Sequence, residues 1–326
     1  MKPISLVNFP PFVGSHCSSS SIARVLRYDG RPLSEALVFG LGSGMGFYYG
    51  YDPAGSPTHR FNGRAADLEG NFYRHVGQPI RWFAGWQPEQ AWQALANGRP
   101  VLAQGDIFYL PYYDPPVHFT GHGVVLSGVD LIAETVEVAD IADPQPITVS
   151  FAHFRAFIET ENLPLLHPFR WGAAPKLESR PVSCQTIHNA LRTLTQTMLT
   201  PPSPSEGLPA MQQMADTLPS WAEAPDWSWC ARFAYQAVEK RGTGGGGFRY
   251  LMAQFFREAA AEWPMLTQLD LPGRMQAIGN QWVALAKTFK AIFVNEDKQG
   301  FVPAGKQLQH IVTAETNLLQ ELATHL

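Results

Sequence analysis

The chain has few cysteines and few charges. Its 326 residues include three cysteines, Cys17, Cys184 and Cys230, and no two of them form a CxxC pair. This sparse, odd set argues against a disulfide framework or a zinc ribbon, and it favours a reducing, cytoplasmic setting with a free thiol. Charged residues make up 16% of the chain, and the net charge is −4. The sequence therefore lacks the basic excess that binding to nucleic acid requires.

Long apolar runs are also missing. The opening MKPISLVNFPPFVGSHC contains one Lys, and Asn8, Pro10 and Pro11 interrupt its apolar stretch. It therefore does not form the core of a signal peptide. No later run reaches the length of a membrane span, so we expect a cytoplasmic protein without a membrane partner. A repeat of fixed period is absent too.

What the sequence does contain predicts a two-domain α+β protein. The length suits about two domains, and the apolar fraction of 45% fills two cores. Residues 1–175 mix short strands with turns and an early helix, whereas residues 180–326 are mainly helical. Aromatic residues reach 12%, which is typical of a partner interface or an aromatic-lined pocket.

The first half contains one clear helix and three clear strands. Ile22, Val25 and Leu26 recur at helical spacing within residues 18–28, so Cys17 lies at a helix N-terminus. The strand segments are short, β-branched or alternating, and end at turn residues. They are RPVLAQGDIFYL (99–110), HGVVLSGVD (122–130) and TVEVADIAD (135–143), which we expect to pair antiparallel.

The second half shows helical periodicity on both sides of a proline-rich segment. Ile187, Leu191, Leu194 and Met198 form one apolar stripe. Residues 201–225 contain six prolines, which predict an ordered excursion or a flexible linker that no continuous helix crosses. A second stripe indicates a helix face buried against other helices, and its members are Met275, Ile278, Trp282, Leu285, Phe289 and Ile292.

Cys17, His122 and Asp140 form the combination that carries chemistry. A helix N-terminus stabilises a thiolate through its unpaired N–H groups and its dipole. An imidazole beside a thiol activates it as a nucleophile. His122 opens one strand, and Asp140 ends the next on the face of Val136 and Val138, so carboxylate and imidazole can meet.

Other residues compete for these roles. Asp143, which precedes Pro144, is an alternative carboxylate, although it can simply start a turn. His118 lies four residues before His122, but the Phe-Thr-Gly between them disfavours a helical metal site, so we predict no metal. Cys184 and Cys230 are interpreted as packing or surface residues.

Two glycine-rich runs do not match nucleotide-binding motifs. Neither GLGSGMG (40–46) nor GTGGGG (242–247) has the spacing of a P-loop or of a dinucleotide fold. We interpret the first as close backbone packing beneath the active site and the second as a loop. Backbone amides of that loop together with Arg249 are an alternative site for a carboxylate or phosphate.

Long segments of the chain resemble a known family. The run GSHCSSSSIARVLRYDGRPLSEALVFGLGSGMGFYY (14–49), the segment DIFYLPYY (106–113) and the strand HGVVLSGVD are similar to the N-terminal domain of the butirosin biosynthesis protein H family. GGGGFRYLMAQFFREAA (244–260) is similar to the helical domain that accompanies it. More widely, the order Cys, His, Asp resembles papain-like cysteine peptidases that process bacteriocin leaders.

This resemblance implies a papain-like fold and assigns roles by position. It implies Cys17 as nucleophile, His122 as base and Asp140 as the carboxylate that orients it. The usual upstream oxyanion Gln is replaced by Pro11, so the alternatives are Asn8 or the backbone N–H groups of Cys17 and Ser18. Weaker candidates for the pocket are His16, Asp106, Tyr109 and His118.

The implied activity is acyl transfer in the biosynthesis of a specialised metabolite. An acyl group passes from a thioester, carried by the phosphopantetheine of an acyl carrier protein or a similar donor, through Cys17 to a small-molecule amine. The enzyme itself needs no cofactor. Two rivals stay open: a cysteine peptidase, amidase or thioesterase with the same triad, and a non-catalytic binding protein. The sequence does not indicate an oligomeric state.

Overall fold

The computed structural model describes residues 3–114, 116–161 and 169–326. The chain forms two compact units, Met1–Val38 with Ala66–Pro181 and Phe39–Ala65 with Val182–Leu326. Residues 39–65 thus pack with the C-terminal half, and helix α2 (Glu35–Leu41) crosses from one unit into the other. The contiguous domains 1–175 and 180–326 stay a prediction, from which the compact units differ over residues 39–65.

The first unit is built on one antiparallel sheet in the order β7-β6-β5-β4-β8, with β1 paired to β5. Together with the surrounding helices, this sheet confirms the α+β class and the predicted antiparallel pairing. The strands are β1 (Ile4–Ser5), β4 (Val101–Asp106), β5 (Thr120–Asp130), β6 (Thr135–Asp140), β7 (Asp143–Ser150) and β8 (Arg170–Ala173).

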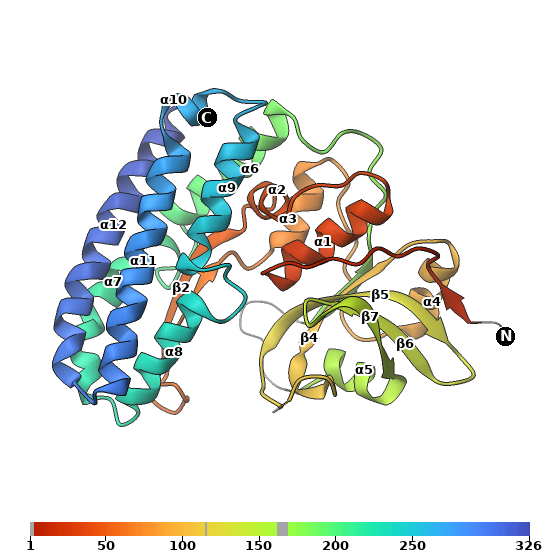
Figure 1. Cartoon of the computed structure of the whole chain (residues 1–326), viewed down its shortest axis with the longest axis horizontal. Coiled ribbons are helices and arrows are strands. Elements are labelled where there is room, and N and C mark those ends of the chain that lie inside the picture. Colours follow the sequence, from red (N-terminus) through yellow and green to blue (C-terminus); the bar gives the residue numbers. More distant parts are fainter. Residues whose placement is uncertain (1–2, 115, 162–168) are drawn as a thin grey trace. The chain divides into compact units, whose positions relative to one another are not determined.

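Helices cover both faces of this sheet (Figure 1). Gly105 of β4 pairs with His122 of β5, so Gly105 and the next residue along β5, Gly123, face opposite sides. A Cβ at Gly105 would meet α5, and one at Gly123 would approach α1, so these helices lie on opposite faces. The helices are α1 (Cys17–Tyr28), α3 (Leu68–His75), α4 (Pro88–Ala96), η1 (Ile107–Tyr109) and α5 (Phe151–Ile158).

The predicted early helix is present as α1. It begins at Cys17, and the side chain of its N-cap residue His16 accepts a hydrogen bond from the Ser19 amide. Ile22, Val25 and Leu26 are fully buried, as their spacing predicts. The serines at positions 18–21 are buried as well, and such small side chains allow α1 to approach the sheet closely.

Two predicted strands end earlier than the sequence pattern suggests. β4 stops at Asp106, because its carboxylate accepts the Phe108 amide and starts the 3₁₀ turn η1. β6 stops at Asp140, and the chain turns back at once so that Asp140 pairs with Asp143 at the start of β7. Hydrogen bonds of local side chains therefore override the apolar pattern at these ends.

The second unit is helical around a short hairpin. From Cys184 on, every described element is a helix, and both predicted stripes are buried. The hairpin of β2 (Met45–Tyr51) and β3 (His59–Arg64) was not predicted. The helices are α6 (Cys184–Leu199), α7 (Gly207–Thr217), η2 (Leu218–Glu223), α8 (Trp227–Glu239), η3 (Gly246–Phe248), α9 (Arg249–Ala259), α10 (Met265–Gln268), α11 (Leu271–Val294), η4 (Lys298–Gly300) and α12 (Phe301–Ala323).

The proline-rich segment 201–225 is ordered and largely helical, so the flexible-linker alternative is wrong. Pro209 lies in the first turn of α7, where the missing N–H costs no intrahelical bond, and Pro219 lies at the start of η2. As predicted, no single helix crosses the whole segment.

A buried ion pair joins parts of the second unit. The guanidinium of Arg249 binds both carboxylate oxygens of Glu315, at 2.8 and 2.9 Å, and donates to the carbonyls of Gly63 and Gly247. Both side chains are fully buried. Arg249 is thus committed to an internal carboxylate, which rules out the exposed anion site that was the alternative for this loop.

The glycines of the 40–46 run provide the close packing that was predicted. A Cβ at Gly40 would lie 1.9 Å from Cγ of Phe255 in α9. One at Gly46 would lie 2.7 Å from the Ala65 amide. These contacts lie within the second unit, and the place of this packing beneath the active site stays a prediction.

Among the described residues, no helix has both the length and the apolar character that a membrane crossing demands.

Candidate active site

Cys17 is the first residue of α1 and is 6% exposed. No acidic residue occupies the first turn of this helix, so the positive end of its dipole is not neutralised from within. Gly123 of β5 faces the start of α1, where an added Cβ would be in ordinary contact, 3.4 Å from the Ser18 hydroxyl. The sequence and packing thus hold the thiol at a buried helix N-terminus.

His122 and Asp140 form a buried hydrogen-bonded pair. Nε2 of His122 lies 2.8 Å from Oδ1 of Asp140, and the two residues are each 4% exposed. The strand register places Val125 opposite Ala139, so Asp140 lies diagonal to His122 on the neighbouring strand. The side chain of Cys17 also forms a hydrogen bond with His122.

Two tyrosines complete the shell around Asp140. The Tyr112 hydroxyl donates to Oδ2 of Asp140 at 2.8 Å, and the Tyr113 hydroxyl donates to the same oxygen at 3.1 Å. Tyr113 also lies 3.2 Å from Nε2 of His122. The Ile141 amide donates to Oδ1 at 2.5 Å. The carboxylate therefore accepts a hydrogen bond from every group around it.

The charges of this cluster support one another. Burial alone would lower the pKa of His122, but the charges and hydrogen bonds of Asp140 and Cys17 outweigh it and raise the pKa to about 10. Burial likewise opposes ionisation of Asp140, yet His122, Tyr112 and the Ile141 amide lower its pKa overall. Burial and the nearby Asp140 raise the pKa of both tyrosines, so they stay protonated donors. His122 is therefore held as the imidazolium at neutral pH.

Glu35 holds the segment that leads into the helix. Its carboxylate accepts the amides of Ser15 and His16, at 2.8 and 2.7 Å. It also accepts the hydroxyls of Ser19 and Ser20, each at 3.0 Å. This network fixes the backbone before Cys17 and the first turn of α1.

The weaker candidates separate into three groups. Ser18 and His16 lie beside Cys17: the Ser18 hydroxyl is 3.9 Å from Sγ, and His16 caps α1. Asn8 lies in an exposed turn with a φ of 59°, and no hydrogen bond among the described residues joins it to the triad. Asp143 is exposed and accepts the Gln145 amide, so it acts in a turn.

Asp106, His118 and Tyr109 form a second cluster. Oδ2 of Asp106 lies 2.8 Å from Nδ1 of His118, and the fully buried Asp106 also accepts the amides of Phe108 and Phe119. The His118 ring stacks on Phe108 at 3.9 Å between centroids, with Tyr109 at its edge. Asp106 therefore fixes the segment that carries Tyr112 and Tyr113.

The other cysteines differ from Cys17. Cys230 is fully buried and donates to Asp226, and burial raises the pKa of its thiol to about 12. Cys184 is exposed, with Sγ 3.5 Å from Nε2 of His188 one turn along α6. Among the described residues, no group of three or more His, Cys, Asp or Glu side chains is arranged to hold a metal ion.

Sequence reasoning missed Tyr112, Tyr113 and Glu35. The two tyrosines lie in the DIFYLPYY segment, which was noted only for its resemblance, and their hydroxyls reach Asp140 through an irregular loop. Glu35 lies 18 residues after Cys17, at the start of α2, and its carboxylate binds residues on both sides of Cys17. Neither arrangement has a fixed spacing that a sequence pattern can reveal.

Comparison with known proteins assigns both halves of the chain. Residues 16–141 match the family described as butirosin biosynthesis protein H, N-terminal. Residues 169–322 match a domain of unknown function, DUF4872. A comparison with curated proteins gives no significant match. The first match spans Cys17, His122 and Asp140. Residues 16–141 therefore form a domain of the butirosin biosynthesis protein H N-terminal family.

Proposed function

We propose that this protein is a cysteine-dependent acyltransferase with a papain-like catalytic domain. Family membership suggests a biosynthetic enzyme with a role in making an antibiotic of the butirosin kind. The observation that carries the finer proposal is the buried His122–Asp140 pair in contact with a thiol at a helix N-terminus. This arrangement favours a thiolate–imidazolium pair, which is the ground state that a cysteine nucleophile needs.

In the first step, the Cys17 thiolate attacks the carbonyl carbon of an acyl thioester. The oxyanion that forms accepts hydrogen bonds from the amides of Cys17 and Ser18 at the start of α1. As the intermediate collapses, the carbon–sulfur bond to the donor breaks, and the departing thiolate takes the proton of the His122 imidazolium. Cys17 then carries the acyl group as a thioester, and His122 is neutral.

In the second step, an amine attacks the Cys17 thioester. Neutral His122 accepts a proton from the attacking nitrogen, the bond between Sγ and the acyl carbon breaks, and an amide leaves. The thiolate–imidazolium pair is restored, so the cycle needs no resident cofactor. Asp140 stabilises the imidazolium in both steps, while Tyr112 and Tyr113 hold the carboxylate in place.

The proposed donor is an acyl carrier protein whose phosphopantetheine arm bears the acyl group, and the proposed acceptor is a small-molecule amine. The family supports this pairing through the biosynthetic role that its name gives. Hydrolysis by the same triad is the alternative chemistry, since water can replace the amine in the second step. Which nucleophile takes the acyl group separates a transferase from a peptidase, amidase or thioesterase.

Intact-protein mass spectrometry tests the proposal. Wild-type protein is mixed with acyl thioesters of pantetheine, and we expect a mass increase equal to the acyl group that an added amine discharges. The Cys17→Ala variant should show no increase, while Cys184→Ala, which lacks the exposed thiol, should behave as wild type. Acylation of Cys17→Ala to the wild-type extent would contradict the proposal, and discharge by water at an unchanged rate with and without amine would favour the hydrolase.

A further inference from the structure

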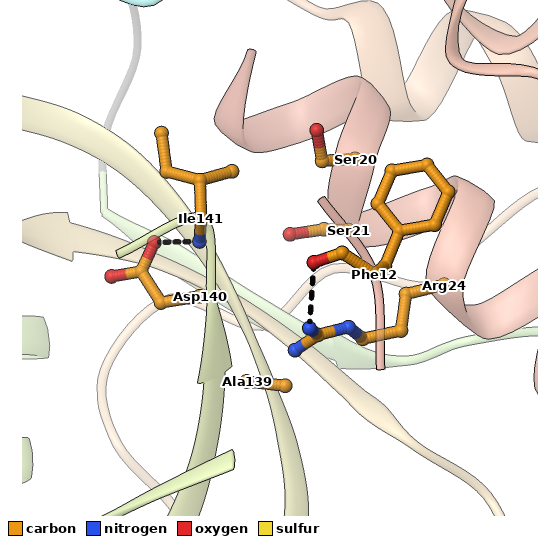
Figure 2. Close-up of a pocket in the computed structure, with 7 residues that line it drawn as sticks. All are labelled: Phe12, Ser20, Ser21, Arg24, Ala139, Asp140 and Ile141. Carbon is orange, nitrogen blue, oxygen red and sulfur yellow. Dashed lines mark hydrogen bonds between the residues drawn. The ribbon is translucent and has the colours of Figure 1, made fainter. Parts of the chain in front are cut away.

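One face of α1 presents more than the nucleophile to the sheet. Residues 17, 20, 21 and 24 lie three, four and seven positions apart and so share a face of the helix. Ser20, Ser21 and Arg24 line a small, partly open cavity that Phe12, Ala139, Asp140 and Ile141 complete (Figure 2). The cavity therefore joins the helix of Cys17 directly to the strand end that carries Asp140.

Arg24 binds backbone on two other segments. Its Nη2 donates to the carbonyl of Phe12 at 3.1 Å and to that of Pro144 at 2.5 Å. Pro144 is the second residue of β7, so only the tight turn after Asp140 separates it from the triad. Figure 2 shows the guanidinium extending from α1 toward Ala139, with its bond to the Phe12 carbonyl drawn. Arg24 thus ties α1 to the turn that positions Asp140.

The charge of Arg24 is not explained by these two bonds. The residue is 3% exposed, and burying a cation costs several kcal/mol. Neutral carbonyls are satisfied by any N–H donor, and Nη1 is buried with no hydrogen-bond partner among the described residues. Burial lowers the pKa of Arg24, whereas the charges of Asp140 and Asp143 oppose that shift. The groups that gain from the cation are therefore the carboxylates at the end of β6 and the start of β7.

We propose that Arg24 is a positioning residue of the active site, which clamps the Asp140 end of β6 against α1 and supplies a positive charge that favours the anionic forms of Asp140 and Cys17. This inference rests on the proposed function of the triad. Arg24 touches no reacting atom and acts through Asp140 and through the electric field at Cys17.

The sign of the effect follows from the charges around the thiol. Removal of a positive charge destabilises both anions, so Cys17 should lose its proton at higher pH. A shift of about half to one pH unit corresponds to about three- to tenfold less thiolate at acid pH. The titratable and charged groups that face this region are His122 on β5, Asp140 on β6, Asp143 on β7, Glu35 on α2, and Tyr112 and Tyr113 on the segment after η1.

The test is the pH dependence of Cys17 alkylation by iodoacetamide in the full chain, quantified by peptide mass spectrometry. Arg24→Gln keeps an N–H donor but removes the charge. Arg24→Lys keeps the charge but removes the planar guanidinium with its several N–H donors. The alkylation rate rises with pH as Cys17 loses its proton, and we call this rise the alkylation limb. We expect the alkylation limb to move to higher pH by about half to one unit in Arg24→Gln and to stay at the wild-type position in Arg24→Lys. Cys184 in the same molecules is the internal reference.

A purely structural role gives a different pattern. It predicts that both variants lose thermal stability while the alkylation limb stays unchanged, and this result would overturn the proposal. So would a shift in Arg24→Lys as large as in Arg24→Gln. If Arg24→Gln does not fold, Arg24→Met, which also removes the charge and keeps a long side chain, takes its place in the same alkylation measurement, and an unshifted alkylation limb in that variant would overturn the proposal.

Alkylation needs no acyl donor, so the two proposals fail separately. A wild-type protein that forms no acyl-enzyme would refute the acyltransferase function. The shift of the alkylation limb would still show whether Arg24 sets the charge state of Cys17.

Discussion

Asp140 is the residue on which the candidate site depends most. Its oxygens accept hydrogen bonds from His122, the Ile141 amide, Tyr112 and Tyr113. A buried carboxylate with all these donors stays ionised, because protonation would leave at least one donor unpaired. Its negative charge in turn keeps His122 protonated. Asp143 has none of these contacts with His122 and is exposed.

We therefore predict that Asp140→Asn lowers kcat/KM for acyl transfer by about 100-fold or more at pH 8. Wild-type His122 keeps its proton until pH approaches 10. Without Asp140, only Cys17 opposes the effect of burial, so the pKa of His122 falls and the imidazole loses its proton at lower pH. The deficit should thus grow as pH rises toward 10. The matched control Asp143→Asn should stay within about twofold of wild type at each pH, and equal losses in the two variants would contradict this role.

Tyr112 and Tyr113 allow a separate test of the hydrogen bonds around Asp140. Tyr112→Phe and Tyr113→Phe each remove one hydroxyl that donates to Asp140. A hydrogen bond to a charged group contributes about 1.5–3 kcal/mol, so each change should lower kcat by about tenfold or more. Tyr109→Phe is the control, because Tyr109 lies in the same segment and packs on Phe108 and His118 instead. Steady-state kinetics measure the three kcat values. A loss of kcat in Tyr109→Phe as large as in the other two variants would refute a specific role of the Tyr112 and Tyr113 hydroxyls.

Part of this residue-level arrangement is accessible from sequence. A cysteine at a helix start and a carboxylate on the apolar face of a strand follow from periodicities of 3.6 and 2, and the structure places Cys17, His122 and Asp140 together. Their catalytic roles stay predictions. Tyr112, Tyr113 and Arg24 act through a loop and a cavity, whose shapes depend on contacts between distant segments.

At the scale of elements, the position of the site depends on glycines that let helices approach the sheet. A Cβ on Gly105 would lie 2.1 Å from the Phe157 carbonyl oxygen of α5. Gly105 pairs directly with His122, so a displaced α5 or β4 would disturb the strand that carries the imidazole. On the other face, Gly123 leaves ordinary contact distance to α1.

Gly105→Ala should accordingly lower the free energy of unfolding by about 1–3 kcal/mol, because backbone must move to admit the methyl group. Acyl transfer should fall at the same time. Gly123→Ala is the matched control, since its nearest neighbours lie at 3.4 Å and it should change stability by less than about 0.5 kcal/mol. Urea denaturation of both variants measures the difference, and equal stability would contradict the packing argument.

Element types were predictable where periodicity is strong. α1, the antiparallel strands and the buried stripes of α6 and α11 all agree with the sequence pattern. The ends of β4 and β6 were wrong because the side chains of Asp106 and the turn after Asp140 stop the strands. The hairpin β2–β3 was missed, since GFYYGY and HRFNGR show no clean alternation between buried core and solvent.

At the scale of the whole molecule, the order of the chain and the order of the packing differ. The hairpin segment 39–65 precedes most of the first unit in sequence but packs within the second. Its contacts there are specific: Tyr49 bonds with Thr217 and Trp221, and Thr58 donates twice to Asp226. Composition predicts a single domain boundary near residue 180. It carries no information on the packing of residues 39–65 against a segment more than 100 residues away.

The ion pair of Arg249 and Glu315 also acts across the second unit. It connects α9 to α12, receives the Trp282 indole of α11 and reaches Gly63 of the hairpin. Glu315→Gln should lower the free energy of unfolding by about 3–5 kcal/mol, because a buried guanidinium loses its countercharge. Glu321→Gln on the same helix breaks the half-exposed pair with Arg274 and should cost less than about 1 kcal/mol. Chemical denaturation that shows similar losses would contradict this assignment.

The hairpin makes a sharper prediction about how the helical half folds. A fragment of residues 182–326 lacks the Gly63 carbonyl and the side chains of Tyr49 and Thr58. The buried side chains of Arg249 and Trp221 therefore each lose a hydrogen-bond partner and become more exposed to solvent. We expect this fragment to unfold without cooperativity and to bind a hydrophobic dye. A permuted fragment that joins residues 39–65 to 182–326 through a flexible linker should instead give one sharp thermal transition. If the shorter fragment melts as cooperatively as the permuted one, the hairpin is an accessory and the contiguous boundary near residue 180 describes the domain.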